Sequence, residues 1–186
     1  EKPSRIHICE GVATALSVFS ATGEVVISAL DAFNLLPVGK NLKKQFKKTE
    51  LVFWADNDWQ KQDKIIRSGS VLGNTGLIQA NRSAFKLRNA LVCTPNFDEL
   101  NETDKQGATD FNDLQSLKGI EALESVVPHK PDLAMALWHE CIANKKRAHG
   151  VVTPSQFENG EKITYLNRYL PKDMFNREGV HLVRSA

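Results

Sequence analysis

Short apolar segments alternate with helical patterns along the first half of the chain. Each apolar segment is a nearly continuous hydrophobic run, which is typical of a strand buried on both faces of a sheet. The expected strands are 5–9, 24–30, 51–55 and 90–95, and the expected helices are a single turn over 31–36 and longer segments over 12–21, 40–48 and 75–89. This alternation predicts βαβ units, and therefore an α/β fold with a mainly parallel four-stranded sheet flanked by helices.

Two connections between these elements carry residues that favour breaks. Pro37–Gly39 is expected to end the helical turn before the next helix begins. The stretch 60–74 is polar and contains Gly69 and Gly73, so we expect a loop there.

The pattern changes after residue 95. A polar loop leads to an expected helix over 109–119, for which Thr109 or Asp110 is the N-cap, and a second helical piece follows over 119–127. The second half of the chain therefore begins with helices that can cover the predicted sheet.

Two prolines, Pro128 and Pro131, indicate a boundary. We expect one domain over 1–128 and a C-terminal extension over 129–186, in which a helix over 131–147 precedes an irregular remainder.

Composition limits the possible partners and compartments. The formal net charge of the 186 residues is +2, so any surface for nucleic acid has to be local. The sequence has no apolar run of the roughly 18 residues needed for a membrane span and no signal-peptide pattern, so no membrane partner is expected. Cys9, Cys93 and Cys141 are widely spaced and form no CxxC pair, which favours a reducing, cytoplasmic location with Cys9 and Cys93 as core residues. The abrupt opening at Glu1, without an initiator methionine, suggests a fragment of a longer protein.

Carboxylates follow two of the predicted strands. Glu10 comes directly after the first strand, and Asp56 and Asp58 come after the third. Because ligands of parallel sheets gather at the carboxyl ends of the strands, these acids are predicted to meet at one edge. Crowded carboxylates must share protons or bind cations, and hard oxygen ligands suit Mg²⁺ or Mn²⁺.

The spacing of the aspartates fits this reading. Alternate residues of an extended chain point the same way, so Asp56 and Asp58 can share an ion while Asn57 faces the other direction. The alternative is that 56–58 is simply a polar loop after a strand.

Three segments occur in a recognisable order: ICEGVATALSV at 8–18, VFWADND at 52–58 and ATDFNDL at 108–114. This set resembles the Toprim domain shared by topoisomerases and primases, most closely the Toprim primases of plasmids, phages and integrated mobile elements. The resemblance covers about residues 5–118. It implies a Rossmann-like sheet that binds divalent metal and carries out phosphodiester chemistry on nucleic acid.

The resemblance also implies roles for individual residues. Glu10, Asp56 and Asp58 match the catalytic acids of a two-metal site for Mg²⁺ or Mn²⁺, and Asp110 and Asp113 match a later acidic motif at the same site. The implied function is the Toprim portion of a DNA primase, a nucleotidyltransferase that makes RNA primers in DNA replication.

The partners implied are a single-stranded DNA template, an RNA primer and nucleoside triphosphates, together with a helicase or other domains of a longer protein. A Toprim-type nuclease is the alternative, as is a metal- and nucleic-acid-binding module that is inactive alone.

The chain departs from the family pattern after Asp58. The glycine that opens the next helix in the family matches Gly76, but residues 60–75 intervene and are expected to face the substrate. Trp59 can stack on a base or pack against the sheet. Gly73–Gly76 lacks the motif of a phosphate-binding P-loop, which makes that function unlikely.

A group of lysines provides the candidate nucleic-acid surface. Lys40, Lys43, Lys44 and Lys47 fall at helical spacing and form one stripe if 40–48 is a helix. Such a stripe can neutralise phosphates, although a solvated helix face has the same pattern.

Overall fold

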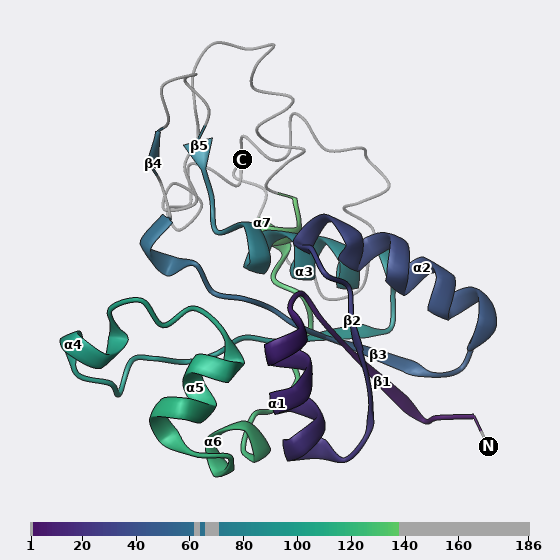
Figure 1. Cartoon of the computed structure of the whole chain (residues 1–186). Coiled ribbons are helices and arrows are strands. Elements are labelled where there is room, and N and C mark those ends of the chain that lie inside the picture. Colours follow the sequence, from purple (N-terminus) through teal and green to yellow (C-terminus); the bar gives the residue numbers. More distant parts are fainter. Residues whose placement is uncertain (1, 62–63, 66–70, 138–186) are drawn as a thin grey trace, which may run out of the picture.

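The centre of the molecule is a four-stranded sheet in which every neighbouring pair of strands is parallel (Figure 1). The computed structural model describes residues 2–61, 64–65 and 71–137. The strand order is β2-β1-β3-β6, with β1 Arg5–Cys9, β2 Val25–Ser28, β3 Glu50–Trp54 and β6 Ala90–Cys93. The predicted α/β class and the four-stranded sheet are therefore confirmed, and this sheet is parallel throughout.

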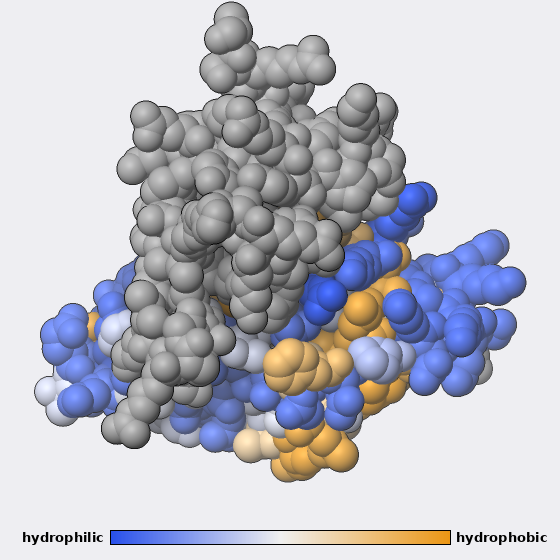
Figure 2. Space-filling view, turned by 90° about the horizontal axis from the view of Figure 1, so that it is seen from above, coloured by the Kyte–Doolittle hydropathy of each residue, from blue (hydrophilic) through white to orange (hydrophobic). Residues whose placement is uncertain are grey.

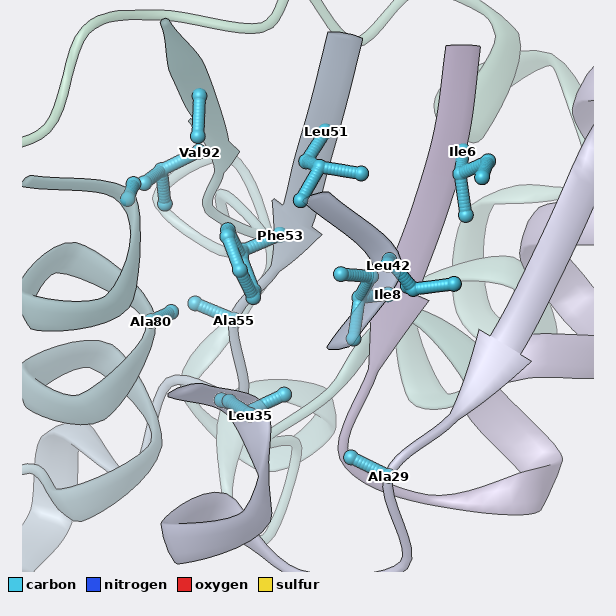
Figure 3. Packing of buried hydrophobic residues seen from close by; sticks show 12 residues of the cluster. Ile6, Ile8, Ala29, Leu35, Leu42, Leu51, Phe53, Ala55, Ala80 and Val92 are labelled. Atoms are coloured by element: carbon cyan, nitrogen blue, oxygen red, sulfur yellow. The ribbon is translucent and has the colours of Figure 1, made fainter. Parts of the chain in front are cut away.

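Helices cover both faces of the sheet (Figure 1). One face carries α2 Leu35–Gln45 and α3 Thr75–Leu87, and the other carries α1 Val12–Thr22, α5 Phe111–Lys118 and α6 Glu121–Glu124. Side chains alternate between the two faces, as they do in any strand. On β3, Leu51 and Phe53 join the first core (Figure 3), while Val52 and Trp54 join the second. Two cores explain why the strands are apolar at nearly every position.

The four predicted strands are confirmed, with small shifts at their ends. The second strand stops at Ser28, because Leu30 takes a left-handed backbone conformation with φ of 66°. The fourth stops at Cys93, two residues before a proline that cannot donate to the ladder. The helices expected over 12–21 and 75–89 are confirmed as α1 and α3.

The expected break at Pro37–Gly39 is wrong. A short 3₁₀ turn, η1 Ala32–Asn34, leads directly into α2, which continues through both residues. Pro37 lies in the first turn, where its missing N–H would have no intrahelical partner. Gly39 lets the helix approach the sheet, since a Cβ there would lie 3.0 Å from Cζ of Phe53. Glycine at this position therefore allows the helix to pack closely on the strand.

The same helix ends earlier than the sequence indicated. The expected helix over 40–48 is wrong at its C-terminal end, because α2 stops at Gln45 and Phe46 is the C-cap. Lys47 therefore lies in the turn before β3.

The described part of the stretch 60–74 is not a plain loop. It contains a 3₁₀ turn and a separate two-stranded antiparallel sheet, so the expectation of a plain loop is corrected. The elements are η2 Trp59–Lys61, β4 Lys64–Ile65 and β5 Val71–Leu72. Strands of two residues are too short for a period-2 pattern to reveal them.

The helices after β6 follow the expected order. Asp110, one of the two suggested caps, is the N-cap of α5, and α6 follows it. A four-residue helix, α4 Glu102–Lys105, lies within the segment expected as a polar loop, which is a further correction.

The described part of the predicted C-terminal extension contacts the sheet domain. His129 exchanges backbone hydrogen bonds of 2.9 Å with Val92 on β6. Asp132 N donates to Asn81 Oδ1 on α3 at 2.7 Å, and α7 Leu133–Ala136 packs on the same helix. The domain boundary after residue 128 stays a prediction, and the rest of the expected helix over 131–147 and the remainder to 186 lie outside the described residues.

Two further expectations concern cysteines and membranes. Cys9 and Cys93 are free and buried, as expected of core residues, and burial raises the pKa of the Cys93 thiol to about 12. Cys141 lies outside the described residues. Of the helices in the described ranges, none has the length and apolar character needed to cross a bilayer.

Candidate functional site

The three acids predicted to meet at one sheet edge do lie at that edge. Glu10 directly follows β1, and Asp56 and Asp58 follow β3, the strand beside it. The two strands are parallel, and their last residues, Cys9 and Trp54, are paired in register. The backbone therefore places these carboxylates at the carboxyl ends of adjacent central strands.

Asp56 is the centre of this acidic group. Burial, and after it the negative charges of nearby acids, raise the pKa of its carboxyl group to about 7. In order of decreasing effect, those acids are Glu10, Asp110, Asp58 and Asp113. The four other predicted carboxylates are thus all close enough to influence Asp56.

One carboxylate oxygen of Asp56 accepts no hydrogen bond from the described residues. This atom, Oδ1, is buried and has no hydrogen-bond partner among them. A buried carboxylate oxygen without a donor is costly, and a bound cation would satisfy it.

Asp110 and Asp113 are held by hydrogen bonds at the start of α5. Asp113 N donates to Asp110 Oδ1 at 2.8 Å and Asp110 N donates to Asp113 Oδ2 at 3.3 Å, which forms a reciprocal capping box. Thr109 N also donates to Asp113 Oδ2, at 2.8 Å. Thr14 Oγ1 on α1 donates to Asp110 Oδ2 at 2.9 Å. These bonds fix both carboxylates beside Asp56 and join α1 to α5.

Asn74 is a site residue that the sequence reasoning missed. It is 1% exposed and caps α3, and its Oδ1 accepts from the backbone N–H of Asp58 at 3.0 Å. Its Nδ2 donates to Asn57 Oδ1 at 2.7 Å, so Asn57 has a structural role. The sequence signal for Asn74 is an asparagine directly before a helical pattern, because asparagine is a favoured N-cap residue. Above, the segment is compared only with the motif of a phosphate-binding loop.

Gly76 lets the start of α3 approach the acidic group. A Cβ at this position would lie 2.6 Å from the backbone oxygen of Asp56 and 2.8 Å from its Cβ. Both distances are far inside van der Waals contact, and one involves backbone that cannot rotate away. Glycine at this position is therefore required by the close approach of α3 to the end of β3.

Trp59 packs beside the site. Its Nε1 donates to the carbonyl oxygen of Ala108 at 3.2 Å, and the ring is packed against the core formed with α1 and α5. The ammonium of Lys105 lies 5.2 Å from the ring centroid, which is a cation–π geometry. These contacts support the packing alternative, and stacking on a base stays a prediction.

The donor set fits a hard divalent cation in its chemistry. Within the described residues, no three His, Cys, Asp or Glu side chains are arranged so that they could hold a metal ion. Mg²⁺ does not need such a cage, because it keeps several waters and binds through one or two carboxylates and substrate phosphates. Carboxylate oxygens, mutual repulsion and the unpartnered Asp56 Oδ1 together suit that mode.

The lysines lie away from the acids. Lys40, Lys43 and Lys44 are on α2, and Lys47 follows it. Lys43 Nζ donates to the backbone oxygen of Thr49 at 2.6 Å, just before β3 begins. The C-terminal end of the stripe is thus at the amino edge of the sheet, opposite the acidic group, although the sequence reasoning placed phosphodiester chemistry near it.

Comparisons of the chain with protein-family models, with curated proteins and with solved structures found no match. The class that fold and site define is an α/β domain whose parallel sheet has an acidic carboxyl edge.

Proposed function

We propose that this chain is a Rossmann-like Toprim domain and that it is the catalytic portion of a DNA primase. Its substrates would be nucleoside triphosphates, which it would join into an RNA primer on a single-stranded DNA template. The observation that carries the proposal is the convergence of four carboxylates around that of the partly buried Asp56.

The arrangement of the acids supports metal-dependent phosphoryl chemistry. Glu10, Asp56 and Asp58 would hold Mg²⁺ or Mn²⁺ at the carboxyl ends of β1 and β3. Divalent ions bound there would supply the positive charge that stabilises the phosphate under attack and the departing pyrophosphate.

Other residues of the chain would keep these ligands in place. Asp110 and Asp113, fixed by their capping box, would position the acidic edge and orient its waters. Asn74 holds the backbone of Asp58, and Gly76 allows α3 to approach Asp56. This supporting set resembles the preorganisation that a catalytic site requires.

Primer synthesis is the direct test. The chain is incubated with single-stranded DNA and labelled ribonucleotides in Mg²⁺ and, separately, in Mn²⁺. Wild type is compared with Asp56→Asn/Asp58→Asn and with a control, Asp98→Asn, whose carboxylate is exposed and is not one of the acids that shift the pKa of Asp56. We expect short RNA products from wild type and the control, and none from the double variant.

Two other results would separate the alternatives. Cleavage of labelled DNA without added ribonucleotides, lost in the double variant, would assign the same acids to a nuclease. Absence of both products in both metals, with Mn²⁺ still bound, would contradict the primase proposal and leave a metal-binding module.

A further inference from the structure

A pocket lies at the amino edge of the sheet, opposite the acidic group. Its volume is about 910 Å³, and it is lined by the turn after α2, the end of α3 and the segment that leads into α7. The first residues of β3 and β6, Glu50 and Ala90, contribute to it. Its size is within the range of ligand pockets in proteins.

Cations from three separate parts of the chain line this pocket. They are Lys43, Lys47, Lys48, Arg88 and Lys130. Glu50 is the single acid among the described residues that line it, and its Oε2 accepts a 2.8 Å hydrogen bond from Nε of Arg5. The pocket therefore has a strong positive excess although the net charge of the chain is only +2.

Local backbone structure brings the cations together. Arg88 and Asn89 have φ of 47° and 44°, and this left-handed turn places Arg88 between α3 and β6. The pairing of His129 with Val92 places Lys130 beside the start of β6. Sequence reasoning found only Lys43 and Lys47 of this group, because helical spacing cannot relate residues in different elements.

Helix ends alone do not account for this charge. Lysines at helix C-termini are stabilised by the helix dipole, and α2 and α3 both end here. Each helix end carries the equivalent of about half a negative charge, so two ends offset roughly one of the five cations. Lys130 belongs to neither helix.

The lining of the pocket combines charged and apolar groups, so it can contact a ligand larger than an isolated anion. Apolar groups from Phe85, Leu91 and Leu133 line it together with the cations. Figure 2 shows hydrophilic and apolar surfaces side by side on the face of the molecule seen from above. Phosphates need the cations, and the apolar groups can contact sugars and bases, as in surfaces that bind single strands.

We propose that this pocket binds the phosphate backbone of a single-stranded nucleic acid. The inference rests on the proposed function only in the choice of nucleic acid as the ligand. The pocket and the acids are separated by the length of the central strands, about 20 Å for six residues of β-structure.

The test measures binding of a labelled single-stranded oligonucleotide in EDTA, so that no metal site contributes. The variant Lys48→Ala/Lys130→Ala removes two exposed pocket cations, and the control Lys86→Ala/Lys118→Ala removes two exposed cations that do not line it. Anisotropy titrations at several salt concentrations give the salt dependence of the binding constant for each protein.

For the pocket variant, the slope of log Kobs against the logarithm of the salt concentration should be smaller in magnitude by about 1.4, because each phosphate contact in a single strand contributes about 0.7. If the two proteins bind equally at 1 M salt, this difference in slope makes the variant bind roughly 25-fold more weakly than wild type at 0.1 M salt. Lys86→Ala/Lys118→Ala should bind nearly as wild type does. Because the titration contains EDTA, its outcome does not depend on metal binding by the acids, which separates this inference from the metal-dependent function.

Two results would overturn the inference. One is an equal loss of slope in the pocket and control variants, which would show diffuse electrostatic attraction. The other is an oligonucleotide affinity unchanged in the pocket variant while its affinity for ATP falls, which would make the pocket a nucleotide site.

Discussion

The two edges of the sheet carry opposite charge and are built in different ways. At the carboxyl edge, acids follow strands directly and Asp56 is partly buried with an unpartnered oxygen. At the amino edge, cations come from helix ends and turns, and most are exposed. The near-neutral composition hides this division, so net charge is a poor guide to binding surfaces in this chain.

The difference in burial predicts a difference in behaviour. Half-buried acids repel one another, so the carboxyl edge is destabilised until a proton or a cation neutralises it. Exposed lysines interact through solvent, so the amino edge depends mainly on salt.

Gly76→Ala should produce the largest loss of stability. Its Cβ would meet the backbone of Asp56 at 2.6 Å, so α3 has to move away from the end of β3. We expect about 3 kcal/mol of destabilisation in denaturant unfolding, together with weaker metal binding.

Gly11→Ala is the matched control for Gly76→Ala at the same edge. The nearest atom to its Cβ would be Thr14 Oγ1 at 4.0 Å, so only a small loss of helix capping is expected, below about 1 kcal/mol. Equal effects of the two substitutions would contradict the close approach.

His7→Leu should destabilise the protein without changing ligand binding at either edge. His7 lies in the middle of β1, where its Nδ1 accepts from Trp54 Nε1 at 2.7 Å and its Nε2 is 2.6 Å from Glu24 Oε2. Leucine leaves the buried indole N–H without an acceptor, at a cost of about 2 kcal/mol. Urea unfolding measures the loss, and normal oligonucleotide binding shows that the amino edge is intact.

The same histidine makes stability depend on pH. Burial lowers the pKa of His7, an effect larger than the opposing attraction of Glu24, while Arg5 lowers it and Glu50 raises it slightly. The fold therefore favours the neutral ring, whose stabilisation is complete above the unfolded pKa of about 6.5 and is lost as pH falls below it. Wild type should lose stability relative to His7→Gln between pH 7 and 5, since glutamine can make both hydrogen bonds but does not titrate. A constant difference over that range would show that the pKa of His7 is the same in the folded and the unfolded protein, which would contradict the lowered pKa.

Asp56→Asn should slightly stabilise the metal-free protein at high pH. The pKa of Asp56 is raised to about 7, so the fold favours the protonated carboxyl group and stability falls as pH rises from about 4 through 7. Removing the charge should raise the free energy of unfolding by on the order of 1 kcal/mol at pH 8, and by less at pH 5. Thermal unfolding in EDTA at the two pH values measures this, and a loss of stability at pH 8 would contradict the account of repulsion.

Much of the sheet could be predicted from the sequence, because strands buried on both faces are continuous apolar runs. Residues that usually break helices gave a wrong prediction where tertiary packing decides the structure. At Gly39 a Cβ would lie 2.5 Å from Leu87 Cδ1 and 3.0 Å from Phe53 Cζ, so close packing favours a glycine inside the helix. The placement of Glu10 and Asp56 at one edge followed from the parallel topology alone.

The supporting residues could not be predicted in the same way. Asn74 bonds to Asn57 and to the backbone of Asp58, across an insertion whose length conceals the relation. Arg88 and Lys130 reach one pocket only through a left-handed turn and a single bridge to β6. These relations depend on three-dimensional packing that no spacing in the chain reveals.

Titration with Mn²⁺ at pH 8 shows whether the carboxyl edge is a metal site, because Asp56, with a pKa raised to about 7, is then mostly ionised. Calorimetric titration of wild type, Asp56→Asn and Asp98→Asn separates the acidic edge from an exposed carboxylate. The account predicts binding to wild type and to Asp98→Asn, and at least tenfold weaker binding to Asp56→Asn in a protein that is still folded. Equal binding by all three proteins, or no binding to wild type, would contradict the assignment of the carboxyl edge as a metal site.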